Sequence, residues 1–315
     1  QKQLNEISEH VGEAVGLSVI SRAHGLTEAD WTPIDQQYGR NASPTFDFDL
    51  ASDGHNFIEI ENKGSLVVDN QVLDKNVKVH KNNIVEKKAA LSGQATGLRY
   101  GTITALDRRQ GSTAKCWLVD PDPEGIEVSP YNLQVLKRMR FLLDWISFLS
   151  PASPLTSALA TRMVDLESIK DLSQLDGMPL RRNAAGESFK YSPFASGRHS
   201  SFFSSKSRII DGPTGGVVIQ VSDSNLFFIG VREDLLMMAA NQSFDEITHF
   251  RAESGTVTKV VDCVLSRGRY EAMSLPGSIR SKVSKSNSYA SFRLGGDMHY
   301  SRGGLVFGVL PLPRE

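Results

Sequence analysis

The sequence contains few cysteines and no pattern that would put them to use. Among its 315 residues only Cys116 and Cys263 are cysteines, and neither belongs to a C-x-x-C pair. This excludes a disulfide framework and a zinc site built from paired thiolates. Both thiols lie in apolar stretches, so we expect them to be buried and free, as in the reducing cytoplasm.

Long apolar runs are also missing. The N-terminus is polar, so we expect no signal peptide. The most apolar helix candidate covers residues 133–149, but charged side chains interrupt it, which excludes a membrane span there. These side chains are Lys137, Arg138, Arg140 and Asp144. We therefore expect a cytoplasmic protein without a membrane partner.

The signatures of several enzyme classes are absent as well. The chain has no G-x-x-x-x-G-K-[S/T] phosphate loop, no G-x-S-x-G nucleophile elbow and no H-E-x-x-H zinc motif. What it has is the composition of a soluble globular protein, with 40% hydrophobic and 23% charged residues.

Residues 44–65 hold the most informative pattern of the chain. Two stretches of alternating apolar and polar residues flank the turn signal Asp53-Gly54, which predicts a β-hairpin. Because side chains alternate along a strand, each strand has an apolar and a charged face. The apolar residues are Phe46, Phe48, Leu50, Ile58 and Ile60, and the charged residues are Asp47, Asp49, Glu59, Glu61 and Lys63.

The charged face of this hairpin gathers carboxylates. An odd number of loop residues brings the apolar faces together, so we expect a loop at 53–55. This register places Asp47 opposite Glu61 and Asp49 opposite Glu59. Like charges in such positions destabilise a hairpin, so we expect a cation there. Mg²⁺ binds through one or two carboxylates and keeps waters for a phosphate group. The alternative is a solvated acidic face.

The pattern D-(x)n-E-x-K across a hairpin resembles the PD-(D/E)xK nuclease superfamily, which includes many restriction enzymes and Holliday-junction resolvases. Asp49, Glu61 and Lys63 match the motif in order, strand placement and spacing. Asp47 is the alternative to Asp49, since both side chains point to the same face. The proline of the family adjoins the first aspartate, whereas Pro44 lies three residues before Asp47, which leaves the choice of aspartate open. The resemblance covers about the first half of the chain.

The resemblance implies a metal-dependent endonuclease that hydrolyses phosphodiester bonds. Asp49 or Asp47, Glu61 and the backbone carbonyl of Asn62 would hold Mg²⁺ or Mn²⁺. Lys63 would position the attacking water or neutralise the charge that develops on the phosphate. The family also suggests weaker candidates on the first helix, on the hairpin and on the crossover helix, namely Glu13, Glu59 and Gln71.

Positive charge follows the carboxylates directly. Residues 63–115 contain ten Lys or Arg and four Asp or Glu, although the net charge of the whole chain is −1. Such a surface suits a nucleic-acid backbone, and double-stranded DNA is the expected partner. The candidate contacts are Lys75, Lys78 and Lys81.

The chain is long enough for two domains, and prolines at 151 and 154 mark the expected boundary. We predict an α/β domain over 1–150, a restriction-endonuclease-like mixed sheet flanked by helices. A β-rich α+β domain of unknown type, for recognition or sensing, is predicted over 151–315. The expected helices are 4–21, 69–92, 132–149, 157–175 and 233–240, and the expected strands after the hairpin are 100–106, 115–120, 216–221, 226–231, 256–265, 289–294 and 304–310.

Two other functions compete with a nuclease. The first is a non-catalytic module of nuclease fold that binds nucleic acid or serves as a scaffold. The second uses Asp47-Phe48-Asp49 as the D-x-D metal motif of a glycosyltransferase, which leaves Glu61 and Lys63 unexplained. Bacterial restriction or anti-phage defence is the role expected by analogy, with the protein as a homodimer or as a subunit of a defence complex.

Overall fold

The protein consists of two compact units, Gln1–Lys137 (unit 1) and Arg138–Glu315 (unit 2), as seen in a computed structural model. The division falls within helix α3 (Pro130–Leu149) and not at the prolines 151 and 154. The structure describes residues 2–34, 46–69, 74–91, 97–107, 109, 113–119, 129–169, 171–182, 184–189, 206–209, 212–286 and 288–313.

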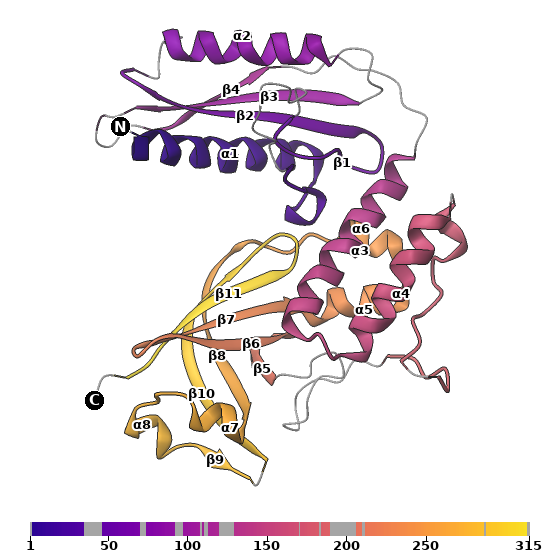
Figure 1. Ribbon diagram of the computed structural model, residues 1–315, viewed down its shortest axis with the longest axis vertical. Helices are drawn as coiled ribbons and strands as arrows, with labels where there is room; N and C mark the ends of the chain where they lie inside the picture. The colour runs from indigo at the N-terminus through magenta and orange to yellow at the C-terminus, as the bar shows by residue number, and fades with distance from the viewer. Residues whose placement is uncertain are drawn as a thin grey trace. The chain divides into compact units, whose positions relative to one another are not determined.

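Unit 1 is built on a mixed four-stranded sheet with the order β1-β2-β3-β4. β2 and β3 pair in parallel, which requires a crossover, and helix α2 supplies it. Helix α1 covers one face of the sheet and α2 the other (Figure 1). The predicted α/β class and mixed sheet are confirmed. The elements are α1 (Lys2–His24), η1 (Glu28–Asp30), β1 (Ala51–Ser52), β2 (Phe57–Val67), α2 (Lys75–Ala90), β3 (Leu98–Asp107) and β4 (Lys115–Val119).

Helix α1 packs directly against the backbone of β2. Ser8, Gly12 and Gly16 are four residues apart and form a ridge of small residues along the helix. A Cβ atom on Gly64 would lie 1.6 Å from the carbonyl oxygen of Ser8, and one on Gly12 would lie 2.5 Å from Gly64. Only glycine permits this approach, and the contact fixes the distance between helix α1 and strand β2.

The hairpin differs from the predicted one. Ser52 pairs with Phe57, so the loop has the four residues 53–56 and not three. The carboxylate of Asp53 stabilises this loop because its Oδ1 accepts hydrogen bonds from the amides of His55 and Asn56. The predicted pairing of Asp47 with Glu61 and of Asp49 with Glu59 is therefore wrong.

The segment before β1 leaves the sheet instead of pairing with β2 along its whole length. Phe48 forms an isolated bridge with Pro33, and the amide of Asp49 donates to the carbonyl of Thr32. Phe46 and Phe48 are nonetheless buried, as the alternation predicts.

The end of α1 is tied to the hairpin and to β3 by hydrogen bonds. His24 Nδ1 lies 2.7 Å from Asp53 Oδ2, and His24 Nε2 lies 2.8 Å from Tyr100 Oη. Burial raises the pKa of Asp53, but the hydrogen bonds from His24 and from the amides of Asn56 and His55 outweigh it, so the pKa is lowered.

Unit 1 is expected to lose stability in acid because of this carboxylate. The pKa of Asp53 is lower in the folded protein than in the unfolded chain, where it is about 4. The ionised carboxylate therefore stabilises the fold at a pH above about 4, and this stabilisation is lost as the pH falls below that value. Asp53→Asn should cost about 2 kcal/mol at neutral pH and flatten this acid dependence. Hydrogen exchange of α1 amides between neutral and acidic pH measures both effects.

His55→Ala is the matched control, since His55 binds Asp53 through its backbone amide alone. Equal pH dependence of Asp53→Asn and the unmodified chain would show that this carboxylate does not carry the effect.

Unit 2 contains a closed barrel. Within the described residues, β11, β7, β6, β5, β8 and β10 follow one another, and the pairing of β10 with β11 closes the ring. The short β9 pairs with the other edge of β10. The strands are β5 (Lys206–Ile209), β6 (Thr214–Ser222), β7 (Asn225–Arg232), β8 (Gly255–Ser266), β9 (Ser284–Lys285), β10 (Tyr289–Tyr300) and β11 (Leu305–Pro311).

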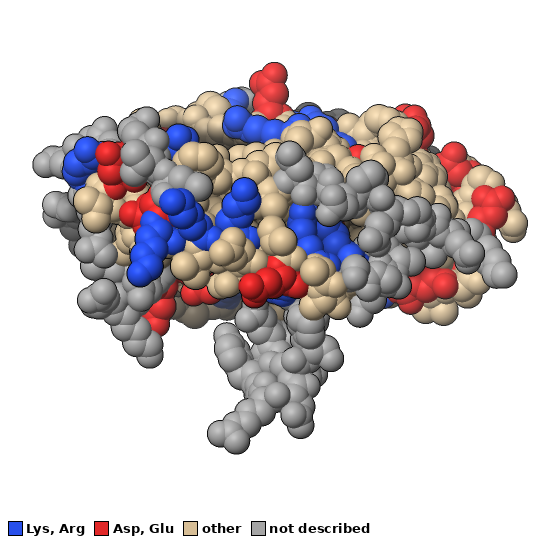
Figure 2. Space-filling view, turned by 90° about the horizontal axis from the view of Figure 1, so that it is seen from above, with Lys and Arg blue, Asp and Glu red and all other residues tan. Residues whose placement is uncertain are grey.

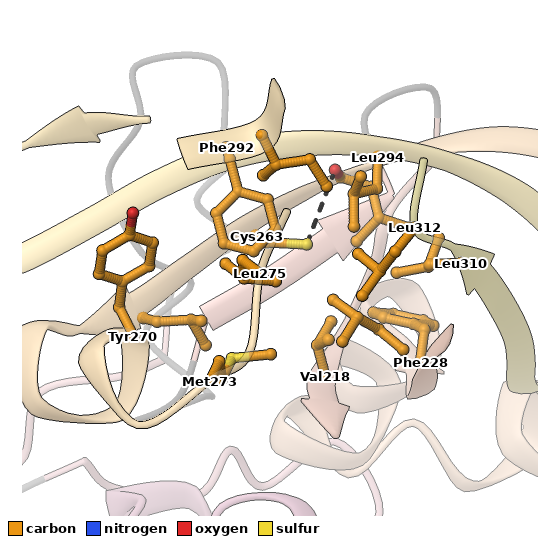
Figure 3. Close-up of a cluster of buried hydrophobic side chains, with 14 of the residues drawn as sticks. Val218, Phe228, Cys263, Tyr270, Met273, Leu275, Phe292, Leu294, Leu310 and Leu312 are labelled. Carbon is orange, nitrogen blue, oxygen red and sulfur yellow. Dashed lines mark hydrogen bonds between the residues drawn. The ribbon is translucent and has the colours of Figure 1, made fainter. Parts of the chain in front are cut away.

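The core of the barrel is apolar and tightly packed. Phe228, Cys263 and Leu310 have no exposed surface, and they lie among leucine, valine and phenylalanine side chains from every side of the ring (Figure 3). Both cysteines are free, as expected, although Cys116 is only half-buried.

The predicted strands of unit 2 are present: four of the five are longer than predicted, and the last is shifted by one residue, to Leu305–Pro311. One of its predicted helices differs more. The predicted helix 157–175 ends earlier, at Ser168. No described helix is both long enough and apolar enough to cross a membrane. The helices after α3 are α4 (Pro154–Ser168), η2 (Leu172–Gln174), α5 (Glu233–Asn241), α6 (Phe244–His249), α7 (Arg267–Glu271) and α8 (Gly277–Arg280).

Candidate functional site

Glu61 lies at the centre of a charged cluster between β2 and α2. Its side chain is only 2% exposed, and each of its oxygens contacts a lysine. Lys63 Nζ lies 2.7 Å from Oε1, and Lys87 Nζ lies 2.5 Å from Oε2. A buried carboxylate is stable only when it is paired in this way. The sheet supplies Glu61 and Lys63 from one face of β2, and α2 supplies Lys87.

Asp47 completes the cluster. Its Oδ2 accepts a hydrogen bond of 2.6 Å from the amide of Asn62, which places Asp47 beside the residue that follows Glu61. Burial and the negative charge of Glu61 raise the pKa of Asp47, although this amide and the lysines Lys63 and Lys87 counteract them. Two acids, Asp47 and Glu61, thus share a partly buried space.

Asp49 and Glu59 have other partners. The side chain of Asp49 is 57% exposed and lies 2.6 Å from Lys137 Nζ. Glu59 Oε2 accepts a hydrogen bond of 2.9 Å from Arg99 Nε on the neighbouring strand. Of the two aspartates that the sequence left open, Asp47 is the one that the fold brings to Glu61.

Lys63 is a cation in this cluster. Burial lowers its pKa, but the charges of Glu61 and Asp47 outweigh burial, so the pKa is raised. Lys63 therefore stays protonated at neutral pH and serves as a positive charge, not as a proton acceptor. The exposed Glu9 of α1 also raises the pKa of Lys63. Glu9 thus acts on Lys63 from α1, and the role of Glu13 stays a prediction.

The inner face of α2 carries His80 and adds Lys87, which the sequence analysis missed. Val77 and Ile84 are buried against the sheet, and His80 and Lys87 each follow one of them by three residues, on the same side of the helix. Burial and the charge of Lys63 lower the pKa of His80, so its imidazole is neutral at neutral pH. The sequence signal for these two residues was the seven-residue spacing of Val77 and Ile84, which defines the buried side of the helix and places His80 and Lys87 toward the sheet.

The outer face of α2 carries the predicted nucleic-acid contacts. Lys75, Lys78 and Lys81 are exposed. Figure 2 looks onto this side and shows Lys and Arg side chains gathered in a band. Two further candidates stay predictions. The candidate ligand at Asn62 is its backbone carbonyl, and its side chain accepts a hydrogen bond from Thr102 on the α1 side. Gln71 lies outside the described residues.

The charged cluster contains two carboxylates, those of Asp47 and Glu61. Among the described residues, no three His, Cys, Asp or Glu side chains form a group that could hold a metal. Mg²⁺ does not need such a group, because it binds through one or two carboxylates and retains several waters. Asp47 and Glu61 are the two carboxylates that could hold such an ion, and burial together with the charge of Glu61 raises the pKa of Asp47.

Comparisons with protein-family models, with curated proteins and with solved structures gave no match to this chain. The resemblance to the PD-(D/E)xK superfamily therefore rests on the quoted residues.

Proposed function

We propose that unit 1 is a Mg²⁺-dependent endonuclease domain of the PD-(D/E)xK type that acts on DNA. One observation carries the proposal: the buried carboxylate of Glu61 lies beside Asp47 and between the ammonium groups of Lys63 and Lys87. Carboxylates that can hold a metal and cations that can face a phosphate are the two requirements of metal-assisted phosphodiester hydrolysis.

Each residue has a distinct part in the proposed reaction. Asp47 and Glu61 would hold Mg²⁺ or Mn²⁺, which would polarise the phosphate and lower the pKa of the attacking water. Lys63, protonated beside Glu61, would stabilise the negative charge that develops on the phosphate. The neutral His80 is available on α2 to accept a proton from that water.

Lys87 would have to leave Glu61 Oε2 when a metal ion takes its place. The ammonium group would then be free to bind a phosphate oxygen of the substrate. Lys87→Gln is therefore expected to lower kcat by about 100-fold, while the Kd for Mn²⁺ without nucleic acid stays equal or falls, because a competing cation has been removed.

Lys78→Gln provides the comparison, since it removes the same charge from the outer face of α2. It should raise KM and leave kcat nearly unchanged. A weaker affinity of Lys87→Gln for Mn²⁺ would show that Lys87 supports the metal site and does not compete with it.

The proposal is tested by incubating the purified chain with plasmid, linear and single-stranded DNA and with RNA, in Mg²⁺, Mn²⁺ or EDTA. Cleavage that requires the metal supports an endonuclease. Binding without cleavage under every condition would favour the non-catalytic module, and hydrolysis of a UDP-sugar would favour the D-x-D glycosyltransferase. Double-strand cleavage would further indicate a homodimer or a partner subunit, as in restriction and anti-phage defence.

A further inference from the structure

A second charged surface lies on unit 2, outside the proposed cleavage site. Residues 267–288 connect β8 to β10 and contain α7, α8 and β9. We call this segment the basic lobe. Its helices α7 and α8 and strand β9 lie beside β8 and β10 (Figure 1), and it has both exposed and buried side chains.

Apolar side chains anchor the basic lobe in the barrel. Tyr270, Met273, Leu275 and Ile279 are between 5% and 8% exposed and belong to the same core cluster as Phe292. Figure 3 shows Tyr270, Met273 and Leu275 turned toward the side chains of the strands. The burial of four large side chains in a segment of this length makes the lobe a fixed part of unit 2.

Hydrogen bonds hold its backbone as well. Arg280 donates from Nε to the carbonyl of Leu275 and from Nη2 to that of Met273. Gln220 of β6 bonds both the amide and the carbonyl of Ser274. The outer side chains of the lobe therefore project from a rigid surface, which reduces the entropy lost when they bind a ligand.

The charged side chains of the lobe are almost all basic. The lobe has five basic residues and one acidic residue, Glu271, a surplus of four positive charges. Arg267 pairs with Glu271, and Lys285 lies 5.3 Å from the centre of the Tyr270 ring. All basic side chains of the lobe and all its serines are exposed: Arg267, Arg269, Arg280, Lys282 and Lys285, with Ser274, Ser278, Ser281, Ser284, Ser286 and Ser288.

We propose that the basic lobe binds the phosphate backbone of a nucleic acid. Lysine and arginine supply the charge that phosphates attract, and serine hydroxyls are common donors to phosphate oxygens. The contact would be independent of base sequence, because contacts to phosphate and sugar carry no sequence information directly. This surface goes beyond the proposed cleavage and does not depend on it.

The chemistry favours a nucleic acid over a membrane. Peripheral membrane segments insert apolar side chains into the lipid, whereas the four large apolar side chains named above point into the barrel. The neighbouring outer face of β8 and β10 carries both signs of charge, with Asp262 and Asp297 besides Arg293. Its charge is therefore mixed, unlike that of the lobe.

The test uses the full chain in EDTA, so that no cleavage occurs, with a short fluorescein-labelled DNA duplex. Fluorescence anisotropy gives the Kd between ~50 and ~200 mM salt for the unmodified chain and for the triple variant Arg269→Gln, Lys282→Gln, Lys285→Gln. Loss of three phosphate contacts should weaken binding by about 100-fold near ~0.15 M salt and reduce the slope of log Kd against log salt by about 2 to 3.

Two control chains accompany the triple variant. Arg182→Gln, Lys259→Gln, Arg302→Gln removes the same charge elsewhere on unit 2 and should change the Kd only a few-fold. The double variant Lys282→Arg, Lys285→Arg, which keeps the charges, should bind as the unmodified chain does. Hydrogen exchange of β8 and β10 confirms that the barrel is intact in each.

Several outcomes would overturn the inference. One is equal Kd values and salt slopes for the triple variant and its charge-matched control. Another is lobe-dependent binding to phosphatidylserine vesicles, or to poly-glutamate, that is tighter than binding to DNA. Cleavage in Mg²⁺ by the triple variant at high DNA concentration would leave the proposed endonuclease intact, because Asp47, Glu61 and Lys63 are unchanged.

Discussion

Glu61→Gln is expected to reduce phosphodiester cleavage by about 1,000-fold while unit 1 stays folded. The substitution keeps the size of the side chain and removes the charge that would hold the metal ion. It also leaves two ammonium groups without their shared carboxylate. The side chain of Lys63 is 31% exposed and that of Lys87 is 21% exposed, so both ammonium groups can turn to water. The loss in the free energy of unfolding should therefore be smaller than for a fully buried ion pair.

Glu59→Gln is the matched control for this prediction. Glu59 lies on the same face of β2, two residues earlier, but it pairs with Arg99. It should keep most of the activity. In the corresponding comparison, Asp47→Asn should lose most of the cleavage activity and Asp49→Asn should keep it. Metal-dependent cleavage that persists in Glu61→Gln would contradict the proposed site.

Gly64→Ala is expected to unfold or loosen unit 1, with a loss of about 3 kcal/mol or more in the free energy of unfolding. The new methyl group would overlap the carbonyl of Ser8, and both are backbone positions that no rotamer change can separate. Helix α1 would have to move away from β2. Since Lys63 precedes Gly64, the charged cluster should be disturbed with it, so activity and stability should fall together.

Hydrogen exchange distinguishes the two units in this experiment, because α1 and β2 amides should lose protection and barrel amides should not. Gly268→Ala is the control, since no atom lies within 4 Å of the position of its Cβ. It should be neutral or slightly stabilising in α7. Unchanged protection of α1 in Gly64→Ala would show that the helix does not need this close approach.

Much of unit 1 was predictable because its signals are local. Alternation along β2 places Glu59, Glu61 and Lys63 on one face whatever the rest of the fold does, since successive side chains of a strand point to opposite sides. The strands of unit 2 were predictable for the same reason. The register of the hairpin was not, because the four-residue loop depends on hydrogen bonds from the loop amides to Asp53.

The sequence by itself determined which residues of β2 share a face and that the chain alternates between helices and strands, since both follow from short periods. The tertiary structure decided that Asp47 and not Asp49 meets Glu61, that Lys87 of α2 joins them, and that β10 pairs with β11 to close the barrel. These contacts join residues far apart in the chain. They depend on how far the segment at Asp47 bends and how strongly the sheet curves, and no local pattern encodes either quantity.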